Sequence, residues 1–148
     1  MAISSYRDLD VYRRAKALIV PMHQLAASFP TQERFDLCAQ IRRASKSVTA
    51  NIVEGYSHDD TPGKAKQFWR IAMGSANELV ERLETAAALE CASEATCQPY
   101  IEQYTIVAKQ LNRLIQRWRA CQPSTSNRQL PTSNIQLPGT SKRRQTHV

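Results

Sequence analysis

The sequence predicts an all-α fold, an up-down antiparallel four-helix bundle followed by a disordered basic C-terminal tail. Apolar residues recur every three or four positions in four long segments, which is the helical period. Glycine is scarce, with four in 148 residues, as is typical of helical rather than strand-rich proteins. Hydrophobic residues make up 42% of the chain, enough for one packed core. We therefore expect a bundle over residues 1–122 and a tail over 123–148.

The first two expected helices are separated by a Phe29-Pro30 break. The first covers residues 8–28 and contains Pro21, which removes a backbone N–H and predicts a kink. Thr31 is expected to cap the start of the second helix, which runs to Gly55. We expect Gly55 to end this helix in a left-handed conformation, which glycine adopts without steric cost.

The third expected helix carries two apolar seams. Thr61 is its expected N-cap and Pro62 its first residue. The seam that faces the bundle interior consists of Phe68, Ala72, Ser75, Leu79, Leu83 and Ala86. The second seam lies about 80–100° around the helix and consists of Trp69, Met73, Ala76, Val80 and Ala87. The fourth helix follows a cap at Ser93 and is expected to end near Pro123.

The second seam predicts a contact between subunits. If Trp69 and Met73 were exposed beside Val80, they would form an unusually apolar patch for a monomer. In a cyclic oligomer, such a face meets a different face of the next subunit. The candidate complements on the side of the second helix are Phe35, Ala39 and Val53. The alternative is that the seam packs inside a thick monomeric bundle.

The chain has a net charge of +7, which favours polyanionic partners. Two groups of basic residues are expected to face outward, one on the second helix and one with a four-residue repeat on the fourth. These candidate nucleic-acid-binding residues are Arg42, Arg43, Lys46, Lys109, Arg113 and Arg117. Each group either contacts phosphates or forms an ordinary solvated or subunit-facing surface.

The tail differs in composition from the rest of the chain. An imperfect repeat, TSNRQLP followed by TSNIQLP, spans residues 125–138, and residues 123–148 hold four basic and no acidic residues. A segment rich in Ser, Thr, Asn, Gln and Pro buries too little apolar surface to become ordered. Because the sequence contains no apolar leader and no run of 18 apolar residues, we expect a cytoplasmic protein with no membrane segment.

The sequence offers little chemistry for catalysis or metal binding. The four cysteines form no CxxC motif, and no histidine stands at zinc-finger spacing. Glu54 and the loop His58-Asp59-Asp60 contain ligand types, but their spacing matches no metal motif, so a polar loop is expected. The unbroken apolar period from Ile41 to Ile52 argues against a helix-turn-helix. We expect no enzymatic activity, cofactor or metal.

Four stretches of the chain resemble a known family. They are DLDVYRRA (8–15), FP (29–30), QIRRASKSVTANIVEGY (40–56) and FWRIAMGSANELVERL (68–83). They are similar to the four-helix-bundle proteins named after intervening sequences in bacterial 23S rRNA genes, over residues 6–120. Pro21, Tyr12 in place of a common Trp, and the repeat tail depart from the family pattern.

The resemblance implies a non-enzymatic helical protein that forms a homo-oligomer, with a pentamer as the family pattern. The family is similar in fold to accessory proteins of diversity-generating retroelements, which are basic pentamers that bind reverse transcriptase and nucleic acid. Two functions remain open: a module that binds RNA or DNA, or a structural oligomer that binds a protein partner such as a reverse transcriptase. Convergence of the six basic side chains favours the first, and local neutralisation by acids favours the second.

Overall fold

The computed structural model describes residues 2–118, which form four long helices and two short 3-10 turns. The turns are η1 (Tyr6–Asp8) and η2 (Thr31–Glu33), and the helices are α1 (Asp10–Ala27), α2 (Leu37–Tyr56), α3 (Pro62–Ala88) and α4 (Glu94–Arg117). No strand occurs within residues 2–118, so the predicted all-α four-helix class is confirmed. The predicted tail over 123–148 lies outside the described residues.

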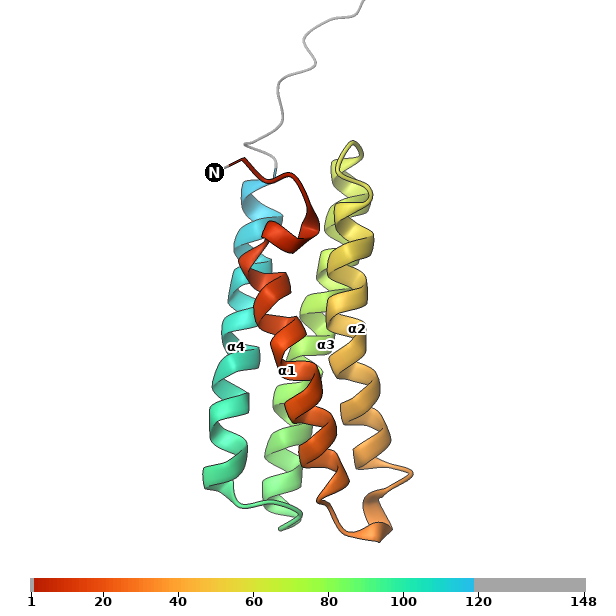
Figure 1. The fold of residues 1–148 in the computed structure, drawn as a ribbon, viewed down its shortest axis with the longest axis vertical. Helices are drawn as coiled ribbons and strands as arrows, with labels where there is room; N and C mark the ends of the chain where they lie inside the picture. The colour runs from red at the N-terminus through yellow and green to blue at the C-terminus, as the bar shows by residue number, and fades with distance from the viewer. Residues whose placement is uncertain (1, 119–148) are drawn as a thin grey trace, which may run out of the picture.

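Consecutive helices run in opposite directions along the long axis of the molecule (Figure 1). The α3 helix packs closely against both α2 and α4, and α1 packs against the same two helices from the other side. As a result, α2 and α4 occupy opposite corners of the bundle. This arrangement determines which outward-facing side chains can meet on one surface.

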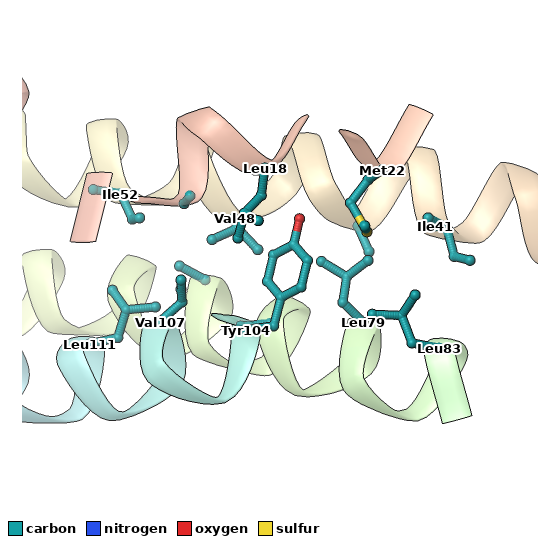
Figure 2. Close-up of a cluster of buried hydrophobic side chains, with 14 of the residues drawn as sticks. Leu18, Met22, Ile41, Val48, Ile52, Leu79, Leu83, Tyr104, Val107 and Leu111 are labelled. Atoms are coloured by element: carbon teal, nitrogen blue, oxygen red, sulfur yellow. The ribbon is translucent and has the colours of Figure 1, made fainter. Parts of the chain in front are cut away.

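The hydrophobic core runs along the bundle axis and draws on all four helices (Figure 2). It includes Leu18 and Met22 from α1, Ile41, Val48 and Ile52 from α2, Leu79 and Leu83 from α3, and Tyr104, Val107 and Leu111 from α4. These side chains follow the apolar period of the sequence, which places them on one face of each helix. Burial of these faces is the main source of helix stability in such a fold.

Gly55 has a different role from the one the sequence predicts. The expected left-handed ending is wrong, because no described glycine has a positive φ and α2 continues through Gly55 to Tyr56. A Cβ atom at Gly55 would lie 2.3 Å from Nε1 of Trp69 and 2.9 Å from the carbonyl oxygen of Ala65. The absence of a side chain therefore lets α3 approach α2 closely, and the Trp69 indole N–H donates a 3.2 Å hydrogen bond to the Ile52 carbonyl.

The start of α2 also differs from the prediction. Thr31 does not cap α2, because residues 31–33 form η2 and the helix begins six residues later, at Leu37. Backbone bonds from Glu33 to Pro30 (3.0 Å) and from Arg34 to Thr31 (3.2 Å) hold this turn. The extra residues let the chain reverse direction while Phe29 and Leu37 both remain buried.

The other helix boundaries lie close to the predicted ones. Pro62 is the first residue of α3, and the Ser93 side chain caps α4 by accepting a 3.1 Å hydrogen bond from the Thr96 amide. The α1 helix continues through Pro21 as one element. The α4 helix ends at Arg117, before the predicted end near Pro123.

Replacing Gly55 with Ala should lower the free energy of unfolding by about 1–3 kcal/mol, because the new methyl group overlaps Trp69 and a backbone oxygen. The matched control is Gly74→Ala within α3, where a Cβ meets nothing within 4 Å. That change should raise stability by about 0.5–1 kcal/mol, since alanine favours helix. Urea denaturation of both variants measures the difference, and equal effects would contradict the packing role of Gly55.

Replacing Tyr104 with Phe should raise the free energy of unfolding by about 1 kcal/mol. Tyr104 is fully buried, and its hydroxyl group points into the core (Figure 2). Within the described chain this hydroxyl group has no hydrogen-bond partner. The same burial raises the pKa of the Tyr104 phenol far above its usual value. Urea denaturation checks this expectation, and a clear loss of stability would mean that the hydroxyl group has a partner in solution.

Candidate nucleic-acid interface

The outer surface of α2 carries a group of cations, which we call the α2 basic face: Arg42, Arg43 and Lys46. The apolar residues of α2 point into the bundle, so these side chains lie on the outside, where Arg42 is half-buried and the other two are exposed. Together with Ala39, Ser47 and Ala50 they line a shallow hollow of about 460 Å³. The predicted outward orientation of Arg42, Arg43 and Lys46 is therefore confirmed.

Within residues 2–118, no carboxylate forms an ion pair with the α2 basic face. The segment 37–53 contains no Asp or Glu, and none of the ion pairs within residues 2–118 involves Arg42, Arg43 or Lys46. Three positive charges within about 6 Å of helix length act together, because this distance is shorter than the Debye length in physiological salt. Such a surface attracts polyanions.

The base of the hollow is anchored to α3 by a small polar network. The hydroxyl groups of Ser47 and Ser75 lie 2.9 Å apart across the contact between α2 and α3. The side-chain amide nitrogen of Asn51 donates to the backbone carbonyl oxygen (2.9 Å) and the hydroxyl oxygen (3.1 Å) of Ser47. These bonds satisfy half-buried polar groups, so Ser47 and Asn51 have a structural role.

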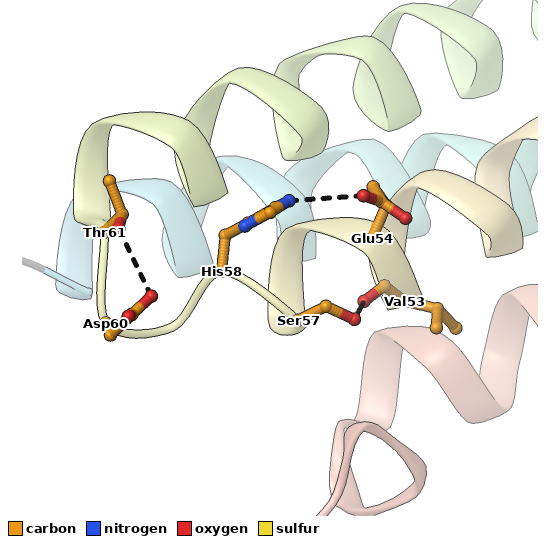
Figure 3. Close-up of polar contacts among 6 residues, drawn as sticks. All are labelled: Val53, Glu54, Ser57, His58, Asp60 and Thr61. Carbon is orange, nitrogen blue, oxygen red and sulfur yellow. Dashed lines mark hydrogen bonds and ion pairs between the residues drawn. The ribbon is translucent and has the colours of Figure 1, made fainter.

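The loop between α2 and α3 is held by side-chain contacts of its own (Figure 3). Nε2 of His58 lies 3.2 Å from a carboxylate oxygen of Glu54, and the imidazole stacks on the Phe68 ring at 5.5 Å. The Thr61 hydroxyl donates to the Asp60 carboxylate at 3.2 Å. Within residues 2–118, no group of three or more His, Cys, Asp or Glu side chains is placed to hold a metal ion. These residues fasten the connection between the helices.

The three described cysteines are buried or half-buried free thiols. Cys38 and Cys97 are almost fully buried, and Cys91 lies in the connection between α3 and α4. Burial raises the pKa of all three thiols above the usual value. The Cys38 thiol donates to the Ala26 carbonyl at 3.1 Å. Because nucleophilic attack requires the thiolate, these cysteines suit packing rather than catalysis.

The basic residues of α4 have a different environment. Lys109, Arg113 and Arg117 are exposed, but the two arginines line a hollow of about 450 Å³ together with Asp8 and Asp10 near the start of α1. Hydrogen bonds from Ser4 and Ser5 hold the pKa of the Asp8 carboxyl below its usual value. Asp8 is therefore negatively charged, and it weakens the positive field of this end of α4.

The six candidate basic residues do not converge on one surface of a single chain. The α2 and α4 helices lie at opposite corners of the bundle. The cations of α2 stand in the first half of that helix, whereas Arg113 and Arg117 stand near the end of α4, toward the other end of the bundle (Figure 1). The structure thus separates one basic face without acids from another that has acids beside it.

The second seam of α3 is not an exposed patch. Trp69 and Ala76 are fully buried, and Met73 and Val80 are half-buried and pack against the core. The expectation that Trp69 is exposed for a partner subunit is wrong, because α3 packs against both α2 and α4 and so buries two seams within one chain. Trp118, the C-cap of α4, makes a T-shaped contact with Trp69, with the ring centres 5.0 Å apart.

The proposed complements of that seam differ in exposure. Phe35 is 87% exposed, Ala39 is exposed and Val53 is half-buried. Arg34, which is not among the residues predicted from the sequence, places its guanidinium 5.6 Å from the centre of the Phe35 ring. The Arg34-Phe35 dipeptide could have indicated this pair in the sequence. The pair was missed because both residues were expected inside a helix that begins at Thr31.

These features define a helical-bundle protein with one unneutralised basic face. The family model of the 23S rRNA-intervening sequence protein matches residues 7–113, and the chain belongs to this family. Among curated proteins, no similar sequence is found. Within the described residues, no helix is long and apolar enough to cross a membrane. The expected cytoplasmic location stays a prediction.

Proposed function

We propose that this protein is a non-enzymatic oligomer that binds nucleic acid, RNA or DNA, through the α2 basic face. The observation that carries the proposal is the grouping of Arg42, Arg43 and Lys46 around one hollow with no carboxylate within ion-pair distance in the described chain. Membership of a family named for 23S rRNA-intervening sequences is consistent with an RNA-related role.

The α2 basic face is favoured over the basic residues of α4 for an electrostatic reason. Phosphate binding releases counterions in proportion to the number of phosphates that the protein neutralises. Arg113 and Arg117 share their hollow with Asp8 and Asp10. Asp10 is paired with Arg13, and the Asp8 carboxylate repels phosphates. The Lys109, Arg113 and Arg117 group is therefore proposed as a weaker, secondary contact.

Reversing two charges of the α2 basic face should weaken nucleic-acid binding at least about tenfold and reduce the salt slope by about two. The variant is Arg42→Glu/Arg43→Glu in the full chain, measured by fluorescence anisotropy with structured RNA and duplex DNA across a salt series. The matched control is Lys109→Glu/Arg113→Glu, which changes the net charge equally on the opposite corner and should weaken binding less.

Two results would overturn the proposal. Equal losses in the two variants would mean that net charge, rather than a site, governs association. Absence of binding by the unmodified chain at low salt would exclude nucleic-acid binding by these surfaces. Circular dichroism confirms that each variant remains folded, which is expected because the substituted side chains face outward.

The second candidate function is a structural oligomer that binds a protein partner without physiological nucleic-acid binding. The observation that favours it is Phe35, since an aromatic ring at 87% exposure is costly in water and suits a protein contact. A reverse transcriptase is one partner that the family resemblance suggests.

Light scattering coupled to size-exclusion chromatography should give an oligomer mass, with five subunits as the pattern that the family resemblance suggests. An oligomer is expected because the family resemblance implies one, and a closed ring presents several copies of one face together. A concentration-independent monomer would contradict the oligomeric part of both proposals.

A further inference from the structure

Phe35 is the most exposed large apolar side chain of the described residues. Its exposed fraction is 87%, and the other large apolar side chains that are exposed within residues 2–118 are aliphatic: Ile3, Val20, Ile71, Leu89 and Ile106. The Arg34 guanidinium lies 5.6 Å from the centre of its ring, within cation–π range. An exposed aromatic ring beside an arginine is a surface on which a planar group can stack.

Phe35 stands close to the α2 basic face. The backbone N–H of Gln40 donates to the Asp36 carbonyl at 3.0 Å, so Asp36 is the N-cap of α2 and Phe35 lies directly before this cap. Ala39, which lines the hollow, is only four residues further on, at most about 14 Å away even in an extended chain. Arg43 lies another four residues along the helix, about 6 Å further. Aromatic ring and cations therefore lie within reach of one short ligand.

The charges around Phe35 also favour an anionic ligand. Two acids, Glu33 and Asp36, flank the ring, but the Asp36 carboxylate accepts a 2.8 Å hydrogen bond from the Gln40 side chain. Across residues 33–46, these two acids are outnumbered by Arg34 and the three cations of the α2 basic face. The segment has a net positive charge.

We infer that this site binds single-stranded nucleic acid, with one base stacked on Phe35 and neighbouring phosphates held by Arg42, Arg43 and Lys46. Proteins that bind single strands combine a basic groove with aromatic side chains on which bases stack. A duplex cannot use the ring in this way, because its bases are paired and stacked inside. This inference rests on the proposed function and adds the class of nucleic acid and the stacking residue.

The test uses the full chain and one 12-nucleotide sequence in three forms: single-stranded RNA, single-stranded DNA, and the RNA annealed to its complement. Phe35→Ala should weaken binding of the single strands about 5- to 100-fold, the range for loss of one base–aromatic stack. The salt slope should stay unchanged, because the ring carries no charge. Binding of the duplex should change little, and Phe35→Trp should restore single-strand binding.

The matched control is Val20→Ala on α1, which removes another exposed apolar side chain and should leave all three affinities unchanged. The inference is overturned if Phe35→Ala weakens binding of the single strands and of the duplex equally. It is also overturned if Phe35→Ala weakens binding of neither form. A change in oligomer mass without a change in single-strand affinity would also overturn it and identify Phe35 as a subunit contact.

If Arg42→Glu/Arg43→Glu weakens binding while Phe35→Ala does not, the proposed function stands and only the stacking role fails. If the unmodified chain binds none of the three forms, both fail.

Unequal binding of RNA and DNA single strands identifies which of the two sugars the site prefers. Equal binding supports recognition through base stacking and phosphate contacts alone, which both nucleic acids offer. A preference for RNA would indicate an additional contact to the 2′-hydroxyl group, since this group distinguishes the two.

Discussion

The close contact between Gly55 and the indole ring of Trp69 is the constraint on which the rest of the bundle depends. Trp69 donates a hydrogen bond to the Ile52 carbonyl of α2, and its ring makes a T-shaped contact with Trp118, the C-cap of α4. One side chain of α3 therefore contacts α2 and α4, and it fits only because Gly55 has no Cβ atom. The bond to the Ile52 carbonyl fits the same rotation of α2 that burial of its apolar face requires, which leaves Arg42, Arg43 and Lys46 facing outward.

That rotation explains the separation of charge over the surface. With Ile52 and Val48 directed inward, Arg42, Arg43 and Lys46 are left on the outside of a segment without acids. At the opposite corner, Arg113 and Arg117 line one hollow with Asp8 and Asp10 because the start of α1 and the end of α4 lie at the same end of the bundle. The net charge of the chain therefore does not show that the α2 face is strongly basic, whereas the α4 face has mixed charge.

Much of the fold could be predicted from the sequence, because helical periodicity records which side of each helix is apolar. The period through Ile41, Val48 and Ile52 located α2, and Pro62 located the start of α3. The role of Trp69 could not be predicted, because periodicity gives the direction of a seam but not the neighbour that covers it. Gly55 was misjudged for a related reason: its function depends on an indole ring from another helix, whereas glycine near a helix end usually signals a left-handed cap.

For the candidate site, the sequence predicted which cations face outward but not which of them remain unneutralised. Asp8 and Arg113 are separated by about a hundred residues, so only the folded chain brings them to one hollow. The exposure of Phe35 depends on the η2 turn, and helix propensity gave no indication that α2 begins as late as Leu37.

The fit between Gly55 and Trp69 has a consequence for how this chain can diverge. A larger residue at position 55 clashes unless the residue at position 69 becomes smaller, and a smaller residue at position 69 leaves a cavity unless position 55 is filled. Each first step is harmful alone, whereas the pair together can be tolerated. Positions 55 and 69 should therefore change in concert among descendants of this sequence, while Arg42 and Lys46 remain free to vary independently of the core.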